Sequence, residues 1–320
     1  MTRSPDTAPD DAPARRDILK CMAWAGTGVV WTISGGLASS ALVTQARASA
    51  PEAGDLTFVQ ISDTHIGFSK AANPDVMGTL QTAISHIQAL AKPPAFILHT
   101  GDITHLSKPE QFDAADQALK SLGLPIFHTP GEHDTLDEGH GKAFLDRYGV
   151  GTKGAGWYSF DHSGTHFIAL VNVIDLQSDN RGKLGDDQIA WLTDDVAHLS
   201  ASTPIVVFAH MPLWDVYQPW GWGTADAARA LEPLKRFGAV TVLNGHIHQV
   251  IEKVEGRVSF HTARSTAYPQ PAPGAAPSPG PMVVPAEQLR SVLGVREITQ
   301  RRGRHALALV DNSLADPSGA

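Results

Sequence analysis

The chain has 320 residues, of which 42% are hydrophobic, so it is long enough for one large core or two modest ones and too polar for a polytopic membrane protein. Its formal net charge of −8 excludes a general attraction to the nucleic-acid backbone. The only cysteine is Cys21, so the chain can form no internal disulfide, and any metal must be held by nitrogen and oxygen ligands.

The N-terminus has the layout of a twin-arginine export signal. Arg15 and Arg16 precede twenty-six uncharged residues, 21–46, and small residues around Ala48 form a cleavage site. We therefore expect residues 1–48 to be a signal peptide that engages the twin-arginine export machinery. Residues 49–320 would then act in the periplasm or outside the cell. The alternative is an uncleaved signal that anchors the chain in a membrane.

From residue 55 onward, short β-branched or aromatic runs alternate with helical patterns, which predicts an α/β domain. The expected strands are 56–61, 95–100, 124–129, 166–173, 204–209, 239–243, 257–262 and 305–310. The expected helices are 76–91, 109–122, 186–199 and 225–237. Helices separate the first three strands, so these should be parallel, whereas the later ones could be antiparallel or mixed.

A proline-rich segment interrupts this pattern near the C-terminus. Seven of the seventeen residues from Pro269 to Pro285 are proline, which predicts an extended loop without a core of its own. A short helical pattern at 285–293 and the strand at 305–310 follow it. We therefore expect a loop that wraps a single domain, with residues 286–320 as a C-terminal extension. The alternative is a linker to a disordered tail.

Metal-binding residue types follow five of the predicted strands, at the strand ends where open α/β sheets bind ligands. They are Asp63 and His65, Asp102, Glu132, His210, and His246 with His248. One such residue alone is more often a turn-former or a packed histidine than a ligand. Five groups in succession would be costly to bury together without a cation. The pattern therefore predicts a metal cluster.

The order Asp-x-His, Gly-Asp, Gly-Glu-His-Asp, His, Gly-His-x-His between residues 55 and 262 resembles the calcineurin-like metallophosphoesterase superfamily. This resemblance implies a four-layer α-β-β-α sandwich with two mixed sheets, of the metallo-dependent phosphatase type. It also implies two divalent or trivalent metal ions, for which Mn, Fe and Zn all suit the ligands. Asp63, His65 and His248 would bind the first metal, Asp102 would bridge both, and Glu132, His210 and His246 would bind the second.

Two cations would lower the pKa of a bridging water, so that hydroxide could attack the phosphorus of a phosphate ester. By its motif position, His133 resembles the family's histidine that contacts the scissile phosphate and protonates the leaving oxygen; its alternative role is a structural hydrogen bond. Resemblance to the cyclic-nucleotide branch favours a phosphodiesterase that acts on a small molecule or lipid. The alternatives are a phosphomonoesterase, a nuclease, which the acidic composition disfavours, and a noncatalytic metal-binding relative.

Two positions depart from the family pattern. Glu132 stands where the family has asparagine, and its charge lies beside a metal that must accept an anionic phosphate. We expect an altered metal preference, weaker phosphomonoester binding, or a role behind the direct ligands. His105 stands where many relatives carry aspartate; it could bind the first metal, contact the substrate or face solvent.

Aromatic residues follow His210 closely in a loop broken by proline and glycine. They are Trp214, Tyr217, Trp220 and Trp222. Such a loop could stack on a base, an aryl group or an acyl chain of the substrate, or its rings could close a small core. Asn172, His261 and Arg264, which also lie near strand ends, are weaker candidates for the pocket.

Overall fold

The computed structural model describes residues 32–34, 37–39 and 55–315, and the chain divides into two compact units, Met1–Ala50 and Pro51–Ala320. In the first unit, strands β1 (Thr32–Ser34) and β2 (Leu37–Ser39) pair antiparallel. The predicted export signal, residues 1–48, lies almost entirely outside the described residues. Among the helices of the described residues, none combines the length and apolar character needed to cross a membrane.

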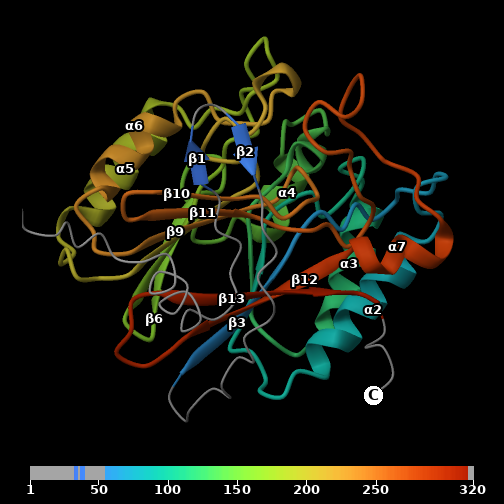
Figure 1. Cartoon of the computed structure of the whole chain (residues 1–320), viewed down its shortest axis with the longest axis horizontal. Coiled ribbons are helices and arrows are strands. Elements are labelled where there is room, and N and C mark those ends of the chain that lie inside the picture. Colours follow the sequence, from blue (N-terminus) through green and yellow to red (C-terminus); the bar gives the residue numbers. More distant parts are fainter. Residues whose placement is uncertain (1–31, 35–36, 40–54, 316–320) are drawn as a thin grey trace, which may run out of the picture. The chain divides into compact units, whose positions relative to one another are not determined.

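Two mixed sheets form the centre of the second unit (Figure 1). The first sheet consists of β3 (Leu56–Ile61), β4 (Ile97–His99), β5 (Ile126–His128), β12 (Gly294–Gln300) and β13 (Leu307–Ser313), in the order β13-β12-β3-β4-β5. The second consists of β6 (Tyr158–His162), β7 (Thr165–Ala169), β8 (Ile205–Ala209), β9 (Val240–Asn244), β10 (Glu252–Glu255) and β11 (Val258–Thr262), in the order β10-β11-β9-β8-β7-β6. Strands β3, β4 and β5 are parallel, as predicted.

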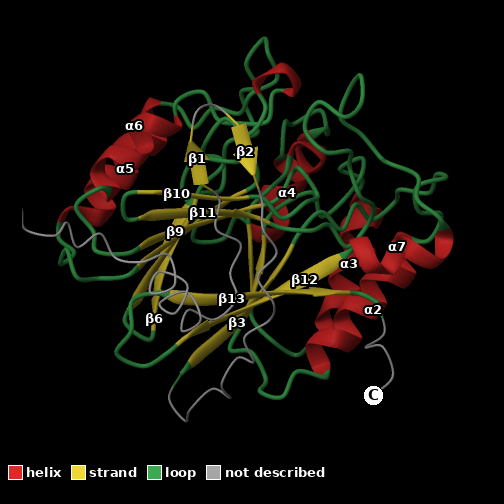
Figure 2. Ribbon diagram, viewed as in Figure 1, coloured by secondary structure: helices red, strands yellow, loops and turns green. Residues whose placement is uncertain are grey.

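Helices cover the outer face of each sheet, which gives the four layers that the sequence predicted (Figure 2). The first sheet carries α2 (Val76–Gln88), α3 (Pro109–Lys120), α4 (Lys142–Tyr148) and α7 (Ala286–Val292), and the second carries α5 (Asp186–Ala197) and α6 (Ala227–Leu231). Short 3-10 turns occur at Glu132–Thr135, Gln218–Trp220 and Glu232–Leu234. Between the sheets, Phe58, Phe167, Phe208 and Ile298 belong to one apolar cluster that holds the layers together.

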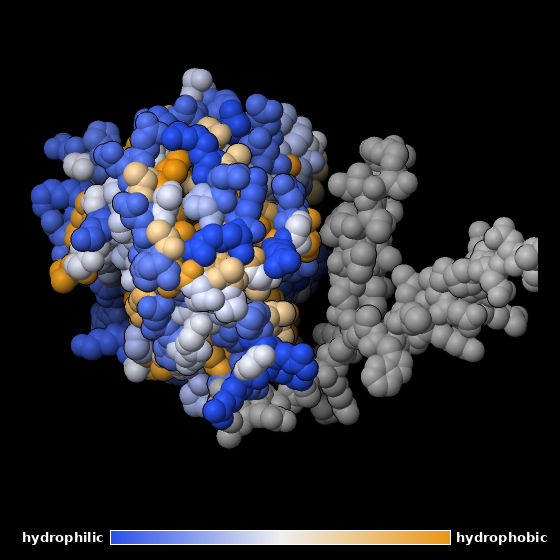
Figure 3. All heavy atoms as spheres, turned by 90° about the vertical axis from the view of Figure 1, so that its left-hand side faces the viewer, coloured by the Kyte–Doolittle hydropathy of each residue, from blue (hydrophilic) through white to orange (hydrophobic). Residues whose placement is uncertain are grey.

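The helices form where polar groups cap an apolar face. Asp75 accepts a hydrogen bond from the Gly78 amide at the start of α2, and Pro109 occupies the first turn of α3. Helix α5 buries Leu192 and Val196, and three of its six exposed residues are aspartate. On the face of the molecule that carries α5 and α6, hydrophilic residues predominate and apolar ones are scattered (Figure 3).

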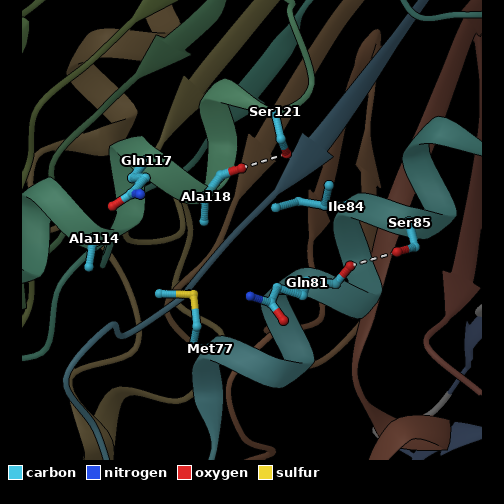
Figure 4. Close-up of a pocket in the computed structure, with 8 residues that line it drawn as sticks. All are labelled: Met77, Gln81, Ile84, Ser85, Ala114, Gln117, Ala118 and Ser121. Atoms are coloured by element: carbon cyan, nitrogen blue, oxygen red, sulfur yellow. Dashed lines mark hydrogen bonds between the residues drawn. The ribbon is translucent and has the colours of Figure 1, made fainter.

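A shallow pocket lies between α2 and α3 (Figure 4). Only uncharged side chains of these two helices and the residue after α3 line it: Met77, Gln81, Ile84, Ser85, Ala114, Gln117, Ala118 and Ser121. The Ser85 and Ser121 hydroxyls donate to backbone carbonyls within their own segments. The pocket therefore offers no titratable or metal-binding group.

Several elements differ from the sequence expectations for identifiable reasons. The strand predicted for 166–173 ends at Ala169, because beyond it the side chain of Gln188 forms hydrogen bonds with both the N–H and the C=O of Val171 (2.8 and 2.7 Å) in place of a neighbouring strand. The helix predicted for 225–237 gives way to a 3-10 turn at Pro233, which has no N–H to donate. Strands β6, β10 and β12 were not predicted.

Residues after the proline-rich segment belong to the first sheet. Strand β12 pairs antiparallel with β3, and β13 pairs with β12, so the C-terminal part of the described chain is built into the sheet next to its first strand. Strand β12 escaped prediction because its sequence contains Arg296 and Glu297, which suggest an exposed loop rather than an interior strand.

Arg296 is only 1% exposed and connects the two sheets. Its guanidinium donates two hydrogen bonds to the Asp311 carboxylate (2.9 and 3.0 Å), one to Gln60 Oε1 (3.3 Å) and one to the carbonyl of Thr262 in the second sheet (2.9 Å). The Gln60 amide in turn donates to Thr100 Oγ1 (3.1 Å) and to the Asn244 carbonyl (3.2 Å). This network holds together the ends of strands from both sheets.

We predict that Arg296→Met lowers the free energy of unfolding by about 3 kcal/mol, because Asp311, Gln60 and the Thr262 carbonyl lose a shared donor in the interior. Urea unfolding followed by circular dichroism measures the change. Arg290→Met, at an exposed position of α7, is the matched control and should change stability by less than about 0.5 kcal/mol. Equal stability of Arg296→Met and the unaltered protein would contradict the prediction.

Candidate metal centre

The seven side chains predicted as metal ligands meet where strands of the two sheets end. Asp63, Asp102 and Glu132 follow β3, β4 and β5, and His210, His246 and His248 follow β8 and β9. Among the described residues, five overlapping groups of three have one ligand atom per residue within 4.8 Å of the others. Two of these groups share no residue and match the predicted ligand sets: Asp63 with His65 and His248, and Glu132 with His210 and His246. Asp102 lies between them, because its Oδ2 is 3.4 Å from both His65 Nε2 and His210 Nε2.

The separations between these atoms match those of atoms bound to a common metal. Two ligand atoms at about 2.1 Å from one ion, at tetrahedral or octahedral angles, are roughly 3.0 to 3.4 Å apart. In the first group, His248 Nε2 lies 3.2 Å from Asp63 Oδ1 and 3.3 Å from His65 Nε2. In the second, Glu132 Oε2 lies 2.9 Å from His210 Nε2, and Glu132 Oε1 lies 2.9 Å from His246 Nδ1. Either group could therefore hold one ion.

Unpaired polar atoms in the second group also fit a cation. Glu132 Oε2, His210 Nε2 and His246 Nδ1 are buried and make no hydrogen bond, although they approach one another closely. Burial lowers the pKa of His210, but the charges of Asp102 and Glu132 outweigh it and raise the pKa well above its usual value. The protein alone would keep a proton on this imidazole as counter-charge, and a metal ion would take that role.

Hydrogen bonds from the protein backbone orient the histidines. His210 Nδ1 lies 2.7 Å from the Thr100 carbonyl, and His248 Nδ1 lies 2.6 Å from the Tyr268 carbonyl. Since a carbonyl only accepts, each Nδ1 carries the proton and leaves the Nε2 lone pair free for a metal. These two contacts fix both the ring orientation and the tautomer.

Five of the seven candidate ligands have left-handed backbone conformations, which are uncommon for residues other than glycine. They are Asp63 (φ 54°), His65 (42°), Asp102 (52°), His246 (70°) and His248 (54°). Each such conformation costs about 1 kcal/mol or more and persists only where surrounding contacts enforce it. Such residues cluster at functional sites, so the backbone supports the same location for the centre as the side chains do.

Glycines of the motifs permit the close approach of the ligand loops. A β-carbon at Gly131 would lie 2.0 Å from Asp102 Oδ1, and one at Gly245 would lie 2.1 Å from Ser62 Oγ and 2.7 Å from Asp63 Oδ2. No side chain fits at either position. The glycines that precede Glu132 and His246 are therefore needed to bring neighbouring loops into contact.

Sequence reasoning assigned no role to Asp134, which joins two of the ligand loops. Its carboxylate accepts hydrogen bonds from the amides of Ile103 (3.0 Å), Thr104 (2.8 Å) and Gly131 (3.0 Å) and from the Thr104 hydroxyl (2.9 Å). A buried carboxylate with four donors holds the loop after β4 against the loop after β5. The feature of the sequence that could have indicated this role is the position of Asp134 at the end of the Gly-Glu-His-Asp motif.

His133 lies between the ligands and His105. Its Nδ1 donates to the His105 carbonyl (2.8 Å), and its amide donates to Asp102 Oδ1 (2.9 Å). Burial lowers the pKa of His133, but the charges of Asp102 and Glu132 outweigh it and raise the pKa. The ring packs edge-on against His65, with centroids 4.8 Å apart, and one of its nitrogens lies within 4.8 Å of carboxylate oxygens of Asp102 and Glu132.

His105 packs behind His65. Its Nδ1 lies 3.5 Å from His65 Nδ1, the nitrogen opposite the one that faces Asp102, and its ring stacks on His133 with centroids 4.7 Å apart. Burial, followed by the charges of His133 and Lys70, lowers the pKa of His105 to about 4. Ligand nitrogens of His105, His65 and His133 also lie within 4.8 Å of one another, so a direct role at the metal centre and a supporting role behind His65 both remain predictions for His105.

The aromatic loop divides into residues that face inward and residues that are partly exposed. Trp222 is 1% exposed and is therefore unavailable for stacking on a substrate. Trp214 packs against Phe260, in the core cluster beneath α5 and α6. Tyr217 and Trp220 are half-buried, as Trp214 is, and they pack edge-to-face with each other outside the core cluster that Trp214 contacts.

The proline-rich segment is fastened beside the second ligand group. The Gln249 amide donates to the carbonyls of Gln270 (3.0 Å) and Pro271 (2.7 Å), and the Gln270 amide donates to the His246 carbonyl (2.8 Å). A β-carbon at Gly274 would lie 3.1 Å from the Tyr217 hydroxyl. The segment therefore contacts the backbone of His246 at one point and the aromatic loop at another.

The three weaker candidates have structural partners. Asn172 is buried, and its amide donates to the Met211 carbonyl and the Thr224 hydroxyl. His261 pairs with Glu252 across the β10–β11 pair (3.0 Å), and the exposed part of Arg264 donates to the Ser291 carbonyl. Each side chain thus joins neighbouring segments, and none of these contacts involves a candidate ligand.

Comparisons with known proteins agree with this geometry. The family described as calcineurin-like phosphoesterase matches residues 56–250. A protein of Arcobacter nitrofigilis, named a probable glycerophosphodiester phosphodiesterase, is 24% identical over 66% of this chain and 78% of its own length. One of Rhodopseudomonas palustris, named a probable cyclic nucleotide phosphodiesterase, is 24% identical over 67% and 79%. The crystal structure of a dimetal phosphatase from Danio rerio has a TM-score of 0.57 at 12% identity, over 82% of this chain and 97% of that one, which supports the fold.

We predict that Glu132→Asn weakens metal binding at the second group by at least about tenfold, because only one of the two carboxylate oxygens near His210 and His246 can be replaced by an amide oxygen. Titration of metal-free protein with Mn(II) or Zn(II), with metal content measured by mass spectrometry, gives the affinity. Glu138→Gln, at an exposed position after the same loop, is the control. Unchanged metal content and substrate profile in Glu132→Asn would leave no special role for the glutamate.

Proposed function

Because the chain belongs to the calcineurin-like phosphoesterase family and is a metal-dependent hydrolase of phosphate esters, we propose that it is a phosphodiesterase with a dinuclear centre that cleaves small phosphodiesters. Two relatives of this chain are named for phosphodiester substrates, one for glycerophosphodiesters and one for cyclic nucleotides. The observation that carries the proposal is the third carboxylate, Glu132, in the cluster.

The charge of the cluster favours a diester. Before a bound water is deprotonated, two divalent cations against the three carboxylates of Asp63, Asp102 and Glu132 leave one net positive charge. A phosphodiester carries one negative charge and balances it, whereas a phosphomonoester carries nearly two at neutral pH. An asparagine in place of Glu132 would leave one more positive charge and would suit a monoester better. The glutamate therefore selects against the more highly charged substrate.

In the proposed centre, Asp63, His65 and His248 hold the first ion, Glu132, His210 and His246 hold the second, and Asp102 contributes to both. When bound, the metal ions would supply Lewis-acid stabilisation of the phosphoryl oxygens and an activated water. The backbone carbonyls of Thr100 and Tyr268 keep His210 and His248 directed at the ions.

We assign the protonation of the leaving oxygen to His133. Since Nδ1 is committed to the His105 carbonyl, the proton for the leaving group would be held at Nε2 and delivered from there. We assign contact with the alcohol portion of the substrate, such as a nucleoside, a glycerol or a lipid headgroup, to Tyr217 and Trp220; the proline-rich segment lies against Tyr217 and supports this assignment.

For the purified protein loaded with Mn(II) or Zn(II), we predict a kcat/KM for bis(4-nitrophenyl) phosphate at least about tenfold above that for 4-nitrophenyl phosphate, since about 1.4 kcal/mol of charge mismatch suffices for this ratio. Glycerophosphodiesters, phospholipids and cyclic nucleotides in the same assay would then distinguish the alcohol portion. A preference for the monoester would contradict the proposal. Inactivity on every substrate, with metal fully loaded, would favour a noncatalytic metal-binding protein.

We predict that His133→Ala reduces kcat by roughly 10²- to 10⁴-fold for a substrate with an alkoxide leaving group, which needs a proton. For bis(4-nitrophenyl) phosphate, whose leaving group needs none, the loss should be far smaller. His105→Ala is the matched control, because it removes the stacked ring and retains the carbonyl that holds His133. Equal losses on both substrates would mean that His133 has a structural role only.

A further inference from the structure

Tyr268 lies in the loop that follows β11, and its side chain is packed against the first ligand group. It is only 4% exposed. Its ring stacks on His65, with centroids 4.8 Å apart and an interplanar angle of 29°, and contacts His248 (4.7 Å) and Phe68 (4.4 Å). Its hydroxyl oxygen lies 3.1 Å from His65 Nε2. The phenol is therefore directed into the cluster.

The partner of this hydroxyl is the atom that would bind the first metal. His65 Nε2 lies 3.3 Å from His248 Nε2 and 3.4 Å from Asp102 Oδ2, so it is the nitrogen that faces the cluster. Its lone pair cannot bind a metal and accept a hydrogen bond together. Among the described residues the Tyr268 hydroxyl has no other hydrogen-bond partner, so metal binding would leave it unpaired in the interior.

We propose that Tyr268 Oη is a further ligand of the first metal, beside Asp63, His65 and His248. The separation of 3.1 Å from His65 Nε2 lies within the range of roughly 3.0 to 3.4 Å expected for two atoms on one ion. On binding, the oxygen exchanges its proton, which leaves to solvent, for a bond to the metal. The inference rests on the proposed function only in requiring that the first group holds a metal.

The loop that carries Tyr268 is fixed to two other ligands. The Ser265 hydroxyl donates to the Asp63 carbonyl (2.7 Å) and accepts from the amides of Ala267 (2.7 Å) and Tyr268 (3.2 Å). The Tyr268 carbonyl in turn accepts the Nδ1 proton of His248 (2.6 Å). The backbone of Tyr268 therefore supports His248 while its side chain reaches the cluster. An anionic oxygen ligand adds a fourth negative charge to those of the three carboxylates, so a hard trivalent ion in the first position would preserve the single positive charge on which the preference for a diester rests.

Tyr268→Phe tests the proposal, because it removes only the oxygen and keeps the ring that packs on His65 and His248. Metal-free protein is titrated with Mn(II), and a second sample is loaded with Fe(III), on which a bound phenolate gives a visible charge-transfer band. Tyr158→Phe is the matched control, since Tyr158 is also largely buried and its hydroxyl donates to the His128 carbonyl (3.1 Å). Thermal unfolding of each metal-free variant shows that the fold is retained.

We expect the Fe(III) band in the unaltered protein and in Tyr158→Phe and its loss in Tyr268→Phe, with at least about a tenfold weaker Mn(II) affinity at one of two sites. Equal Mn(II) affinities for Tyr268→Phe and the unaltered protein would overturn the assignment. The assay uses no substrate, so its result is independent of the proposed activity. If the enzyme is active and Tyr268→Phe binds metal as the unaltered protein does, the assignment of Tyr268 as a ligand is refuted and the proposed function is not. An unaltered protein that takes up no metal would refute the dinuclear centre itself.

Discussion

One electrostatic constraint governs the organisation of this structure. Three carboxylates repel one another, and imidazole nitrogens between them have no hydrogen-bond partner among the described residues. Asp63, Asp102 and Glu132 lie in one buried cluster with four histidines, and this arrangement is costly unless cations occupy it. Five of the seven candidate ligands also have left-handed backbone conformations, which are themselves unfavourable. Glycines at the loop contacts and backbone carbonyls behind the histidines are the devices that hold the side chains in place.

Because the ligands come from both sheets, the centre depends on how the sheets are held together. Arg296 and Gln60 form hydrogen bonds from the first sheet to the ends of β9 and β11 in the second, directly beside the ligand loops. Arg296 lies on a strand near the C-terminus that pairs with β3, the strand before Asp63. Segments more than two hundred residues apart thus support one ligand loop.

The sequence predicted those parts of the site that depend on local pattern. Asp63, Asp102 and His246 stand directly after apolar strands and within motifs, so their positions could be inferred before their contacts were known. Strand β12 was not predicted, because a charged residue such as Arg296 usually indicates an exposed position. Arg296 can be buried only because the fold brings Asp311 close enough to form an ion pair with it. Tyr268 was missed because it lies outside every motif and reaches the cluster through the path of a loop, which periodicity does not encode.

In the proposed dinuclear centre, the position of Asp102 would couple the two halves thermodynamically. One carboxylate oxygen is 3.4 Å from a histidine of each group, so an ion in either half would polarise the same oxygen. Occupancy of one half must then alter the affinity of the other, and by the reciprocity of linked equilibria the effect is equal in both directions. In the proposed centre, metal loading would therefore be a property of the pair of sites rather than of either site alone.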